Sequence, residues 1–285
     1  MLTRRRFTAL TAAAAAALAA PMKLQAAATR SGLEFGLALY TVRNYLKDMG
    51  AMLDLIHQIG YATIELFPAV YNRPARELKA LIESHGLKAP SGHFDYEVIA
   101  DKVDYAAELG LKYMICPMIP RPQWDSLDGF RKAAAHLNHV SAKVTAAGMK
   151  LAYHAHNYEF KPIEGSTGFA VLMKELDPAV RLELDVYWVT EAGQNVLEVM
   201  KQNRQRLALM HLKDRKPAAA FSFVPGPKGS HFTEVGSGTI DWKAVIGEAN
   251  RLGVKQYFVE EDVYDLPYEQ AIRSSWNYLS KLAIS

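Results

Sequence analysis

Short apolar runs alternate with longer amphipathic stretches along most of this chain of 285 residues. The short runs have the length of buried strands. The longer stretches repeat apolar residues every three or four positions, as helices packed on one side do, and several of them stop at a glycine. The pattern predicts strands at 33–40, 63–67, 87–93, 111–116, 151–154, 181–185, 207–211 and 256–260. It predicts helices at 44–59, 74–85, 96–109, 124–147, 167–176, 189–203, 242–252 and 268–282.

This alternation predicts one α/β domain, a (β/α)₈ TIM barrel over residues 29–285. A doubly wound open sheet is the alternative. That fold calls for a glycine-rich turn after the first strand, where this chain has Tyr40-Thr41-Val42-Arg43. In a barrel, the active site lies where the strands end and the following loops begin.

The first 28 residues have the features of an export signal. Paired arginines precede Phe7, an uncharged apolar stretch covers 12–20, and alanines at 26–28 offer a cleavage site. These features predict a twin-arginine signal peptide at 1–28 and a periplasmic location. The apolar stretch is short for a bilayer span, so no stable membrane anchor is expected.

Removal of this segment changes the charge of the chain. The full sequence carries +3, and residues 1–28 contain four basic and no acidic residues, so 29–285 carries about −1. A domain without a basic excess is not expected to bind nucleic acid or an anionic membrane. Cys116 is the single cysteine, which excludes an intrachain disulfide and favours a buried apolar role.

Four successive strands in the second half end in side chains that bind metals. These are His154, Asp185, His211 and Glu260. Two imidazoles and two carboxylates suit one borderline-to-hard divalent ion, which indicates an enzyme. His156 lies on the same side of its strand as His154, and Glu261 follows Glu260, so both of these choices stay open.

Seven stretches of the chain together resemble a known family. They are Gly36-Leu-Ala-Leu-Tyr-Thr-Val-Arg43, Gly60-Tyr-Ala-Thr-Ile-Glu65, Tyr153-His-Ala-His-Asn-Tyr-Glu-Phe160, Leu184-Asp-Val-Tyr-Trp188, His211-Leu-Lys-Asp214, Gly236-Ser-Gly-Thr-Ile-Asp-Trp242 and Val259-Glu-Glu-Asp262. In this order they resemble the sugar phosphate isomerase/epimerase family of xylose-isomerase-like barrels. The resemblance implies one divalent metal ion, with Mn²⁺ favoured over Zn²⁺, Co²⁺ or Mg²⁺, and Asp185, His211 and Glu260 match its ligand pattern.

The chain departs from that family on the fifth strand. Ketose epimerases of the family carry a glutamate where this chain has His154 or His156. In those enzymes, two facing carboxylates remove and return a proton on opposite faces of a carbon, and an imidazole in place of one removes a base. The variant favours one-sided chemistry, which is enolisation followed by elimination, hydration or glycosidic cleavage.

The resemblance implies a metal-dependent isomerase or epimerase that acts on a keto sugar or polyol through an enediolate. A lyase or dehydratase and a keto-glycoside-cleaving enzyme are the alternatives within the family. Glu260 is the predicted base, and Glu159 or a histidine is the second acid or base. Lys213 is predicted to bind substrate oxygens or donate protons.

Four further residues at the strand ends are predicted to bind substrate. They are Glu65, His93, His156 and Trp188, with Trp188 offering an apolar face to a sugar ring. For Glu65, an ion pair with Arg43 is the alternative.

The loop at 214–236, which contains prolines and glycines, follows the strand that ends in His211. It is interpreted as a lid, a surface insertion or a contact between copies, so a homo-oligomer stays open. It lacks the Walker spacing, which favours a non-phosphorylated sugar as the small-molecule substrate. Two rivals remain: a DNA-repair nuclease of the same superfamily, which a charge near −1 opposes, and a non-catalytic periplasmic sugar-binding protein.

Overall fold

Eight parallel strands close into a barrel in the order β1-β12-β9-β8-β5-β4-β3-β2. The strands are β1 (Gly36–Ala38), β2 (Thr63–Leu66), β3 (Lys88–His93), β4 (Tyr113–Cys116), β5 (Lys150–Ala155), β8 (Arg181–Asp185), β9 (Leu207–Leu212) and β12 (Gln256–Val259). The structure is a computed structural model, and it describes residues 29, 31–218, 220–226 and 231–284. The predicted (β/α)₈ barrel is confirmed, whereas the predicted signal peptide at 1–28 lies outside the described residues.

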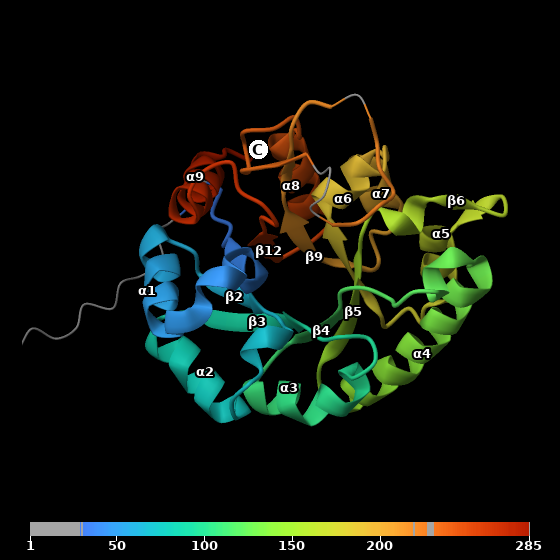
Figure 1. The fold of residues 1–285 in the computed structure, drawn as a ribbon, viewed down its shortest axis with the longest axis horizontal. Coiled ribbons are helices and arrows are strands. Elements are labelled where there is room, and N and C mark those ends of the chain that lie inside the picture. The colour runs from blue at the N-terminus through green and yellow to red at the C-terminus, as the bar shows by residue number, and fades with distance from the viewer. Residues whose placement is uncertain (1–28, 30, 219, 227–230, 285) are drawn as a thin grey trace, which may run out of the picture.

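Helices surround the strands, as Figure 1 shows. They are α1 (Met49–Ile59), α2 (Ala75–Ser84), α3 (Val103–Leu109), α4 (Leu127–Ala146), α5 (Gly168–Glu175), α6 (Val186–Glu191), α7 (Val196–Gln202), α8 (Trp242–Arg251) and α9 (Tyr268–Lys281). Short 3₁₀ turns precede or link them at η1 (Leu39–Asp48), η2 (Pro68–Val70), η3 (Ile99–Lys102), η4 (Gln123–Asp125) and η5 (Tyr158–Phe160). None of the helices in the described part of the chain is both long and apolar enough to cross a bilayer.

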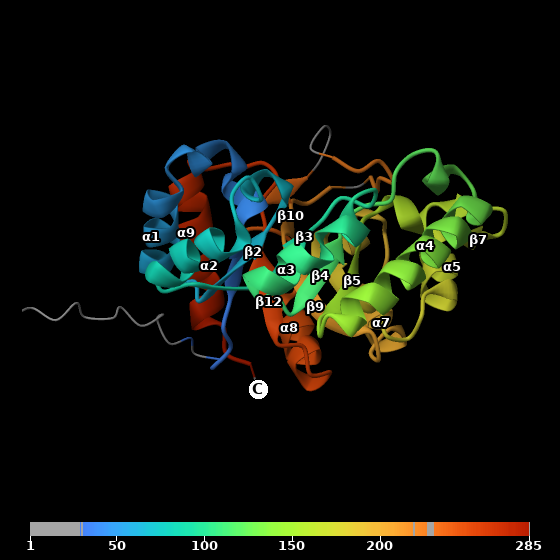
Figure 2. The same cartoon turned by 90° about the horizontal axis from the view of Figure 1, so that it is seen from below.

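Two small hairpins stand outside the barrel sheet. One pairs β6 (Pro162–Ile163) with β7 (Ser166–Thr167), and the other pairs β10 (Asp214–Arg215) with β11 (Phe232–Thr233). In the side view of Figure 2, β10 and the orange segment around it lie near one edge of the barrel, and the C-terminus lies at the opposite edge. The second hairpin therefore belongs to the rim where β9 ends.

The predicted helices at 44–59 and 96–109 start later in the structure, at Met49 and Val103, after 3₁₀ turns. Two further predicted elements also differ. The first strand is short because the 3₁₀ turn η1 begins at Leu39, within the predicted strand 33–40. The predicted helix 189–203 is two helices, α6 and α7. Gly193, with φ of 73°, follows α6, and the side chain of Asn195 accepts the backbone N–H of Glu198 to start α7.

The interior of the barrel is layered, because alternate residues of each strand point inward. Five apolar residues form a cluster of their own inside it: Ala38, Ile115, Ala152, Leu209 and Phe258. Two positions further along their strands stand His154, His211 and Glu260, in the direction of the carboxyl ends. The apolar layer therefore closes the barrel beneath a polar layer. Outside the strands, a larger apolar cluster joins the sheet to the helices.

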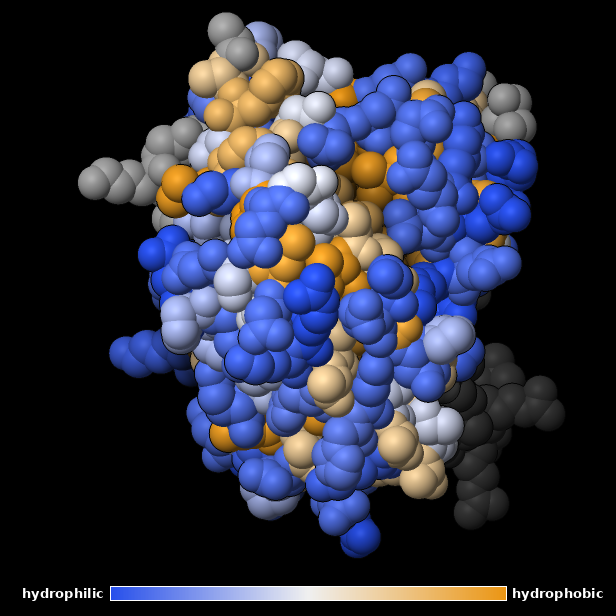
Figure 3. All heavy atoms as spheres, turned by 90° about the vertical axis from the view of Figure 1, so that its right-hand side faces the viewer, coloured by the Kyte–Doolittle hydropathy of each residue, from blue (hydrophilic) through white to orange (hydrophobic). Residues whose placement is uncertain are grey.

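The outer faces of the helices are mostly polar. Figure 3 shows the side of the molecule that carries α4 and α5, where hydrophilic side chains predominate and apolar atoms appear mainly in the hollows between them. Amphipathic helices that bury one face against a sheet produce this pattern.

The turn before α4 depends on the absence of a side chain at Gly129. A Cβ atom there would lie 2.0 Å from the backbone oxygen of Gln123. Gly129→Ala is therefore expected to lower the free energy of unfolding by about 1–3 kcal/mol, because the backbone must shift.

Gly247→Ala in α8 is the matched control: its Cβ would meet Ile284 at an ordinary 3.8 Å. That change should raise stability by about 0.5–1 kcal/mol through helix propensity. Urea unfolding measures both, and equal shifts in the two variants would contradict the packing argument.

Candidate metal centre

The four predicted metal ligands lie together at the carboxyl end of the barrel. Asp185 Oδ2 is 3.7 Å from His154 Nε2 and 4.0 Å from His211 Nδ1. Glu260 Oε2 is 2.9 Å from His211 Nδ1. One ligand atom each from Asp185, His211 and Glu260 lies within 4.8 Å of the others. We call Asp185 and Glu260 the outer carboxylates, and all four side chains are buried.

A second group of side chains lies deeper in the barrel. Glu183 Oε2 is 2.9 Å from His154 Nδ1 and 3.0 Å from His93 Nε2. Glu65 Oε1 is 2.5 Å from His211 Nε2 and 3.0 Å from His93 Nε2. We call Glu65 and Glu183 the inner carboxylates. His93, His154, Glu183 and His211 form a second set of donor atoms within 4.8 Å of one another.

Glu183 is absent from the site predicted from sequence. Its signal was present, since it lies two residues before Asp185 on β8 and so faces the same side of the strand. The predicted ligands are the last polar residue of each strand, whereas Glu183 is the inward polar residue before the last one on β8. Glu65 pairs with two histidines and accepts a hydrogen bond from Ser91 Oγ, whereas the alternative partner Arg43 binds the backbone oxygens of Tyr40 and Asp262.

Lys213 brings the only ammonium group into this part of the described structure. Its Nζ lies 3.0 Å from Asp185 Oδ2, 2.5 Å from Glu260 Oε2 and 3.1 Å from Asp262 Oδ2. Three carboxylates thus contact a single lysine, and the inner carboxylates Glu65 and Glu183 add two more to the same end of the barrel. Buried charge of one sign is costly unless cations balance it.

The carboxylates respond to this crowding in different ways. Burial raises the pKa of Glu183 to about 7, and the neighbouring Glu65 carboxylate adds to the shift. Burial also favours the neutral form of Glu65, but His93 and His211 outweigh it and hold the pKa of Glu65 well below its usual range. In the same way, Lys213 and His211 overcome burial and lower the pKa of Glu260. Glu260 is therefore ionised at neutral pH.

The histidines also divide into two kinds. Burial lowers the pKa of His154 well below its usual value, and lowers that of His156 to about 3. For His93, burial lowers the pKa but the carboxylates of Glu65 and Glu183 raise it overall to about 9. His211 is likewise raised, because three carboxylates outweigh its burial. His154 is therefore a neutral imidazole with a lone pair, the form that binds metals.

A cavity of about 620 Å³ opens above these groups. Its polar lining includes His93, His154, His156, Lys213 and Glu260, and its apolar lining includes Tyr40, Phe67, Met118, Trp124 and Trp188. The cavity has the size of a small-molecule site, and charged groups stand beside aromatic faces as a polyhydroxylated ring requires. The predicted substrate-binding residues His93, His156 and Trp188 thus line one cavity, whereas Glu65 does not.

Two alternatives from sequence analysis are resolved by side-chain direction. Glu260 faces the cavity, whereas Glu261 Oε1 accepts a hydrogen bond from Ser275 on α9. Glu159, the predicted second acid or base, does not line the cavity. Its buried carboxylate accepts hydrogen bonds from the Tyr153 hydroxyl and the His156 backbone N–H, so its position does not support that role.

His154 and His156 occupy different places although both come from one end of β5. His154 lies between Glu183 and Asp185, whereas His156 lies next to Trp188, with ring centroids 5.5 Å apart. The geometry therefore favours His154 over His156 as the metal-facing residue.

The described part of the loop at 214–236 is attached to the barrel. Asn157 Nδ2 donates to the backbone oxygens of Ser222 and Val224, and Arg215 Nε donates to the buried Glu191. Pro225 and Gly226 follow and line the cavity. This segment therefore forms part of the cavity wall.

The donor set fits a divalent metal ion. Within the described residues, Asp185 Oδ2 and Glu183 Oε1 are buried side-chain oxygens without a hydrogen-bond partner, although Lys213 Nζ lies close to the first. The neutral imidazole of His154, the imidazole of His211 and the two outer carboxylates are ligands that Zn²⁺, Mn²⁺ and Co²⁺ accept. His154, Asp185, His211 and Glu260 would hold such an ion.

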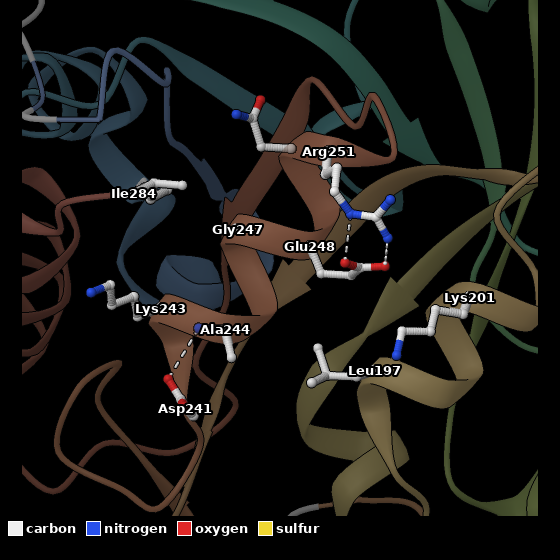
Figure 4. Close-up of a pocket in the computed structure, with 10 residues that line it drawn as sticks. Leu197, Lys201, Asp241, Lys243, Ala244, Gly247, Glu248, Arg251 and Ile284 are labelled. Carbon is white, nitrogen blue, oxygen red and sulfur yellow. Dashed lines mark hydrogen bonds and ion pairs between the residues drawn. The ribbon is translucent and has the colours of Figure 1, made fainter.

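A second hollow lies between the outer helices α7 and α8 (Figure 4). The carboxylate of Glu248 is paired with Arg251 at 2.5 Å, and Asp241 accepts the backbone N–H of Ala244. The hollow shares no lining residue with the central cavity, and these acidic groups are already satisfied. It is not a candidate for the same chemistry.

Known proteins resemble this chain in sequence and in fold. Residues 53–282 match the family of xylose isomerase-like TIM barrels. The chain is similar to the inosose dehydratase of Geobacillus thermodenitrificans strain NG80-2, with 26% identity over 247 residues that cover 72% of this chain and 80% of that protein.

Two solved structures have the same fold. A sugar phosphate isomerase/epimerase from Parabacteroides distasonis ATCC 8503 superposes with a TM-score of 0.74 and 24% identity, covering 88% of this chain and 94% of that chain. The IolI protein, whose structure holds a zinc atom, superposes with a TM-score of 0.70 and 16% identity, covering 88% of this chain and 98% of that chain. At these identities, the two superpositions establish the fold alone.

The outward-facing Glu261 gives a test of side-chain direction at the end of β12. Burial raises its pKa to about 8, with a smaller opposing contribution from Ser275. The unfolded chain ionises near 4.5 while the folded protein keeps the proton, so this carboxyl lowers stability as pH rises from about 4.5 to about 8. Glu261→Gln is expected to remove this loss, on the order of a few kcal/mol at pH 8.

Urea unfolding at several pH values measures the effect. The wild type should lose more stability across this window than Glu261→Gln does, and parallel curves would show that Glu261 is not buried as described.

Proposed function

Because this chain belongs to the xylose isomerase-like TIM barrel family, we propose that it is a divalent-metal-dependent enzyme that removes a proton beside the carbonyl of a non-phosphorylated keto sugar or keto polyol. The observation that carries the proposal is the meeting of Asp185, His211 and Glu260 next to a cavity lined by aromatic rings, whose wall includes Glu260. The sequence similarity of this chain to an inosose dehydratase supports it. The similar fold of the IolI protein, whose structure holds a zinc atom, supports it as well.

The metal would be held by His154, Asp185, His211 and Glu260. When bound, such an ion withdraws electrons from a carbonyl oxygen and lowers the barrier to loss of the neighbouring proton. Mn²⁺ is the favoured ion in this proposal, with Zn²⁺, Co²⁺ and Mg²⁺ as alternatives.

Glu260 is the proposed base. Its carboxylate faces the cavity and is kept ionised by Lys213 and His211. It takes the proton from the carbon beside the carbonyl, and the electron pair of the broken C–H bond becomes part of an enediolate or enol. Lys213 lies 2.5 Å from Glu260, so its ammonium group reaches the oxygens of the same part of the substrate. His93, His156 and Trp188 complete the wall against which the ring would rest.

The second step decides the type of enzyme. Isomerisation or epimerisation returns the proton to carbon, whereas dehydration breaks a C–O bond at the next carbon and releases water. For dehydration, Lys213 gives a proton to the leaving hydroxyl and is reprotonated by solvent, while Glu260 gives its new proton to solvent. A symmetrical epimerase needs a base on each face, and neither His154 nor the inward-facing residues of β5 supply a carboxylate. We therefore place dehydration beside isomerisation as the second candidate, supported by the similarity to inosose dehydratase.

The ligand assignment predicts a joint loss of metal and turnover. His211→Ala and Asp185→Asn are expected to bind less than one metal ion per protein and to exchange protons at least about 100-fold more slowly. Each substitution alters a side chain that would bind the ion directly. His139→Ala, at an exposed position on α4, is the control and should keep both. Elemental analysis gives the metal content, and NMR in heavy water follows deuterium entry into an inosose and a 3-keto-glucoside.

Three results separate the candidates. Exchange with release of water indicates the dehydratase, and exchange without it indicates the isomerase or epimerase. Substrate binding with no exchange in the metal-loaded wild type would instead favour the sugar-binding protein. Unchanged metal content in both ligand variants would reject the metal centre.

We also propose export by the twin-arginine route, on the sequence of residues 1–28 alone. Replacement of both Arg4 and Arg5 by Lys is expected to leave the protein in the cytoplasm, because that pathway reads the paired arginines. Cell fractionation with detection of the protein in each fraction measures this, and undiminished export of the variant would remove the proposal.

A further inference from the structure

Two buried carboxylates take no part in the proposed reaction, yet they contact imidazoles of the candidate metal centre and of the cavity wall. Glu65 and Glu183 are 1% and 0% exposed, and neither lines the cavity. They cannot meet a substrate directly. Whatever they contribute must pass through the side chains that they contact, which are His93, His154 and His211.

The ring of His154 stands between an inner and an outer carboxylate. Its Nδ1 lies 2.9 Å from Glu183 Oε2, which is hydrogen-bonding distance, whereas its Nε2 lies 3.7 Å from Asp185 Oδ2. In its ionised form Glu183 accepts hydrogen bonds, so it places the ring proton on Nδ1. The lone pair is then on Nε2, which faces the outer carboxylates.

The ring of His211 is arranged in the opposite sense. Its Nε2 lies 2.5 Å from Glu65 Oε1, on the inner side. Its Nδ1 faces outward, 2.9 Å from Glu260 Oε2 and 4.0 Å from Asp185 Oδ2. Glu65 therefore keeps the proton on Nε2, and the outward proton on Nδ1, which faces Glu260 in the metal-free protein, is the one that a metal ion would displace.

The inner carboxylates are themselves fixed. Ser91 Oγ donates to Glu65 Oε2, which leaves Oε1 turned toward the imidazoles. His93 Nε2 lies 3.0 Å from both Glu65 Oε1 and Glu183 Oε2 and so links the two. Neither carboxylate can rotate away without breaking a buried contact, which is costly.

We propose that Glu183 and Glu65 are positioning residues that set opposite tautomers in the two metal-facing histidines, so that His154 presents Nε2 and His211 presents Nδ1. This inference rests on the metal centre of the proposed function, but not on the reaction. Carboxylates that accept the second N–H of a metal-binding imidazole raise metal affinity, and their loss typically costs 10–100-fold.

The test compares Glu183→Leu with Glu183→Gln. Leucine fills similar space but accepts no hydrogen bond, whereas the glutamine oxygen still accepts the Nδ1–H of His154. Zinc affinity, measured by competition with a chromophoric chelator, should fall about 10–100-fold for leucine and stay within about threefold of wild type for glutamine. Glu261→Gln is the matched control, since that buried carboxylate faces Ser275, and it should bind zinc as the wild type does.

A second readout needs no bound metal. Nitrogen-15 NMR of the imidazoles should show His154 protonated on Nδ1 in the wild type and in Glu183→Gln, and a changed tautomer in Glu183→Leu. If the wild-type spectrum shows the His154 ring protonated on Nε2 instead of Nδ1, the inference is overturned. This result does not depend on whether the leucine variant folds. Equal zinc affinity for wild type and a folded leucine variant would also overturn it, because a purely structural role lowers the melting temperature without changing affinity.

These outcomes are distinct from failure of the proposed function. Absence of proton exchange with every keto sugar tried would reject the proposed reaction, while the tautomers and the zinc affinities would still decide the role of Glu183.

Discussion

The concentration of buried negative charge at the carboxyl end of the barrel is the constraint on which the rest of the site depends. Two inner and two outer carboxylates gather there with Asp262, and the one ammonium group among the described residues of this site, that of Lys213, contacts only the outer carboxylates and Asp262. Such a group is stable only if protons, imidazoles or a metal ion balance it. The structure shows the first two responses: the pKa of Glu183 is raised to about 7, and that of His93 to about 9. A divalent ion among the outer groups would supply the third.

The barrel makes this concentration of charge possible because side chains along each strand point alternately inward and outward. Inward positions two residues apart stack into layers, and in the strand register the apolar residues Ala38 and Leu209 pair with the inner carboxylates Glu65 and Glu183. The outer carboxylates and Lys213 follow at the ends of the strands, where the cavity opens. His154 and His211 lie between the inner and outer carboxylates, and each turns one ring nitrogen toward either side. The fold thus separates the inner carboxylates, which orient the imidazoles, from the outer carboxylates and Lys213, which would bind the metal ion and the substrate.

Much of this arrangement could be predicted from sequence, since the barrel follows from the alternating periods and from helix ends such as Gly110, which has φ of 85°. Asp185, His211 and Glu260 follow from their places at strand ends. Glu183 and the distinction between His154 and His156 do not, because they depend on which layer a residue occupies and on a partner far away in sequence. The sequence also could not show that the carboxylate of Glu159 accepts hydrogen bonds from the Tyr153 hydroxyl and from the backbone N–H of His156. Local pattern predicts which residues face inward, whereas contacts between strands decide what each one does.

Anomalous diffraction from crystals of the protein loaded with Mn²⁺ or Zn²⁺ would locate the ion in the barrel. We expect one strong peak bonded to His154 Nε2, Asp185, His211 Nδ1 and Glu260. No peak at the carboxyl end of the barrel, or a peak bonded to other side chains, would contradict the proposed metal centre.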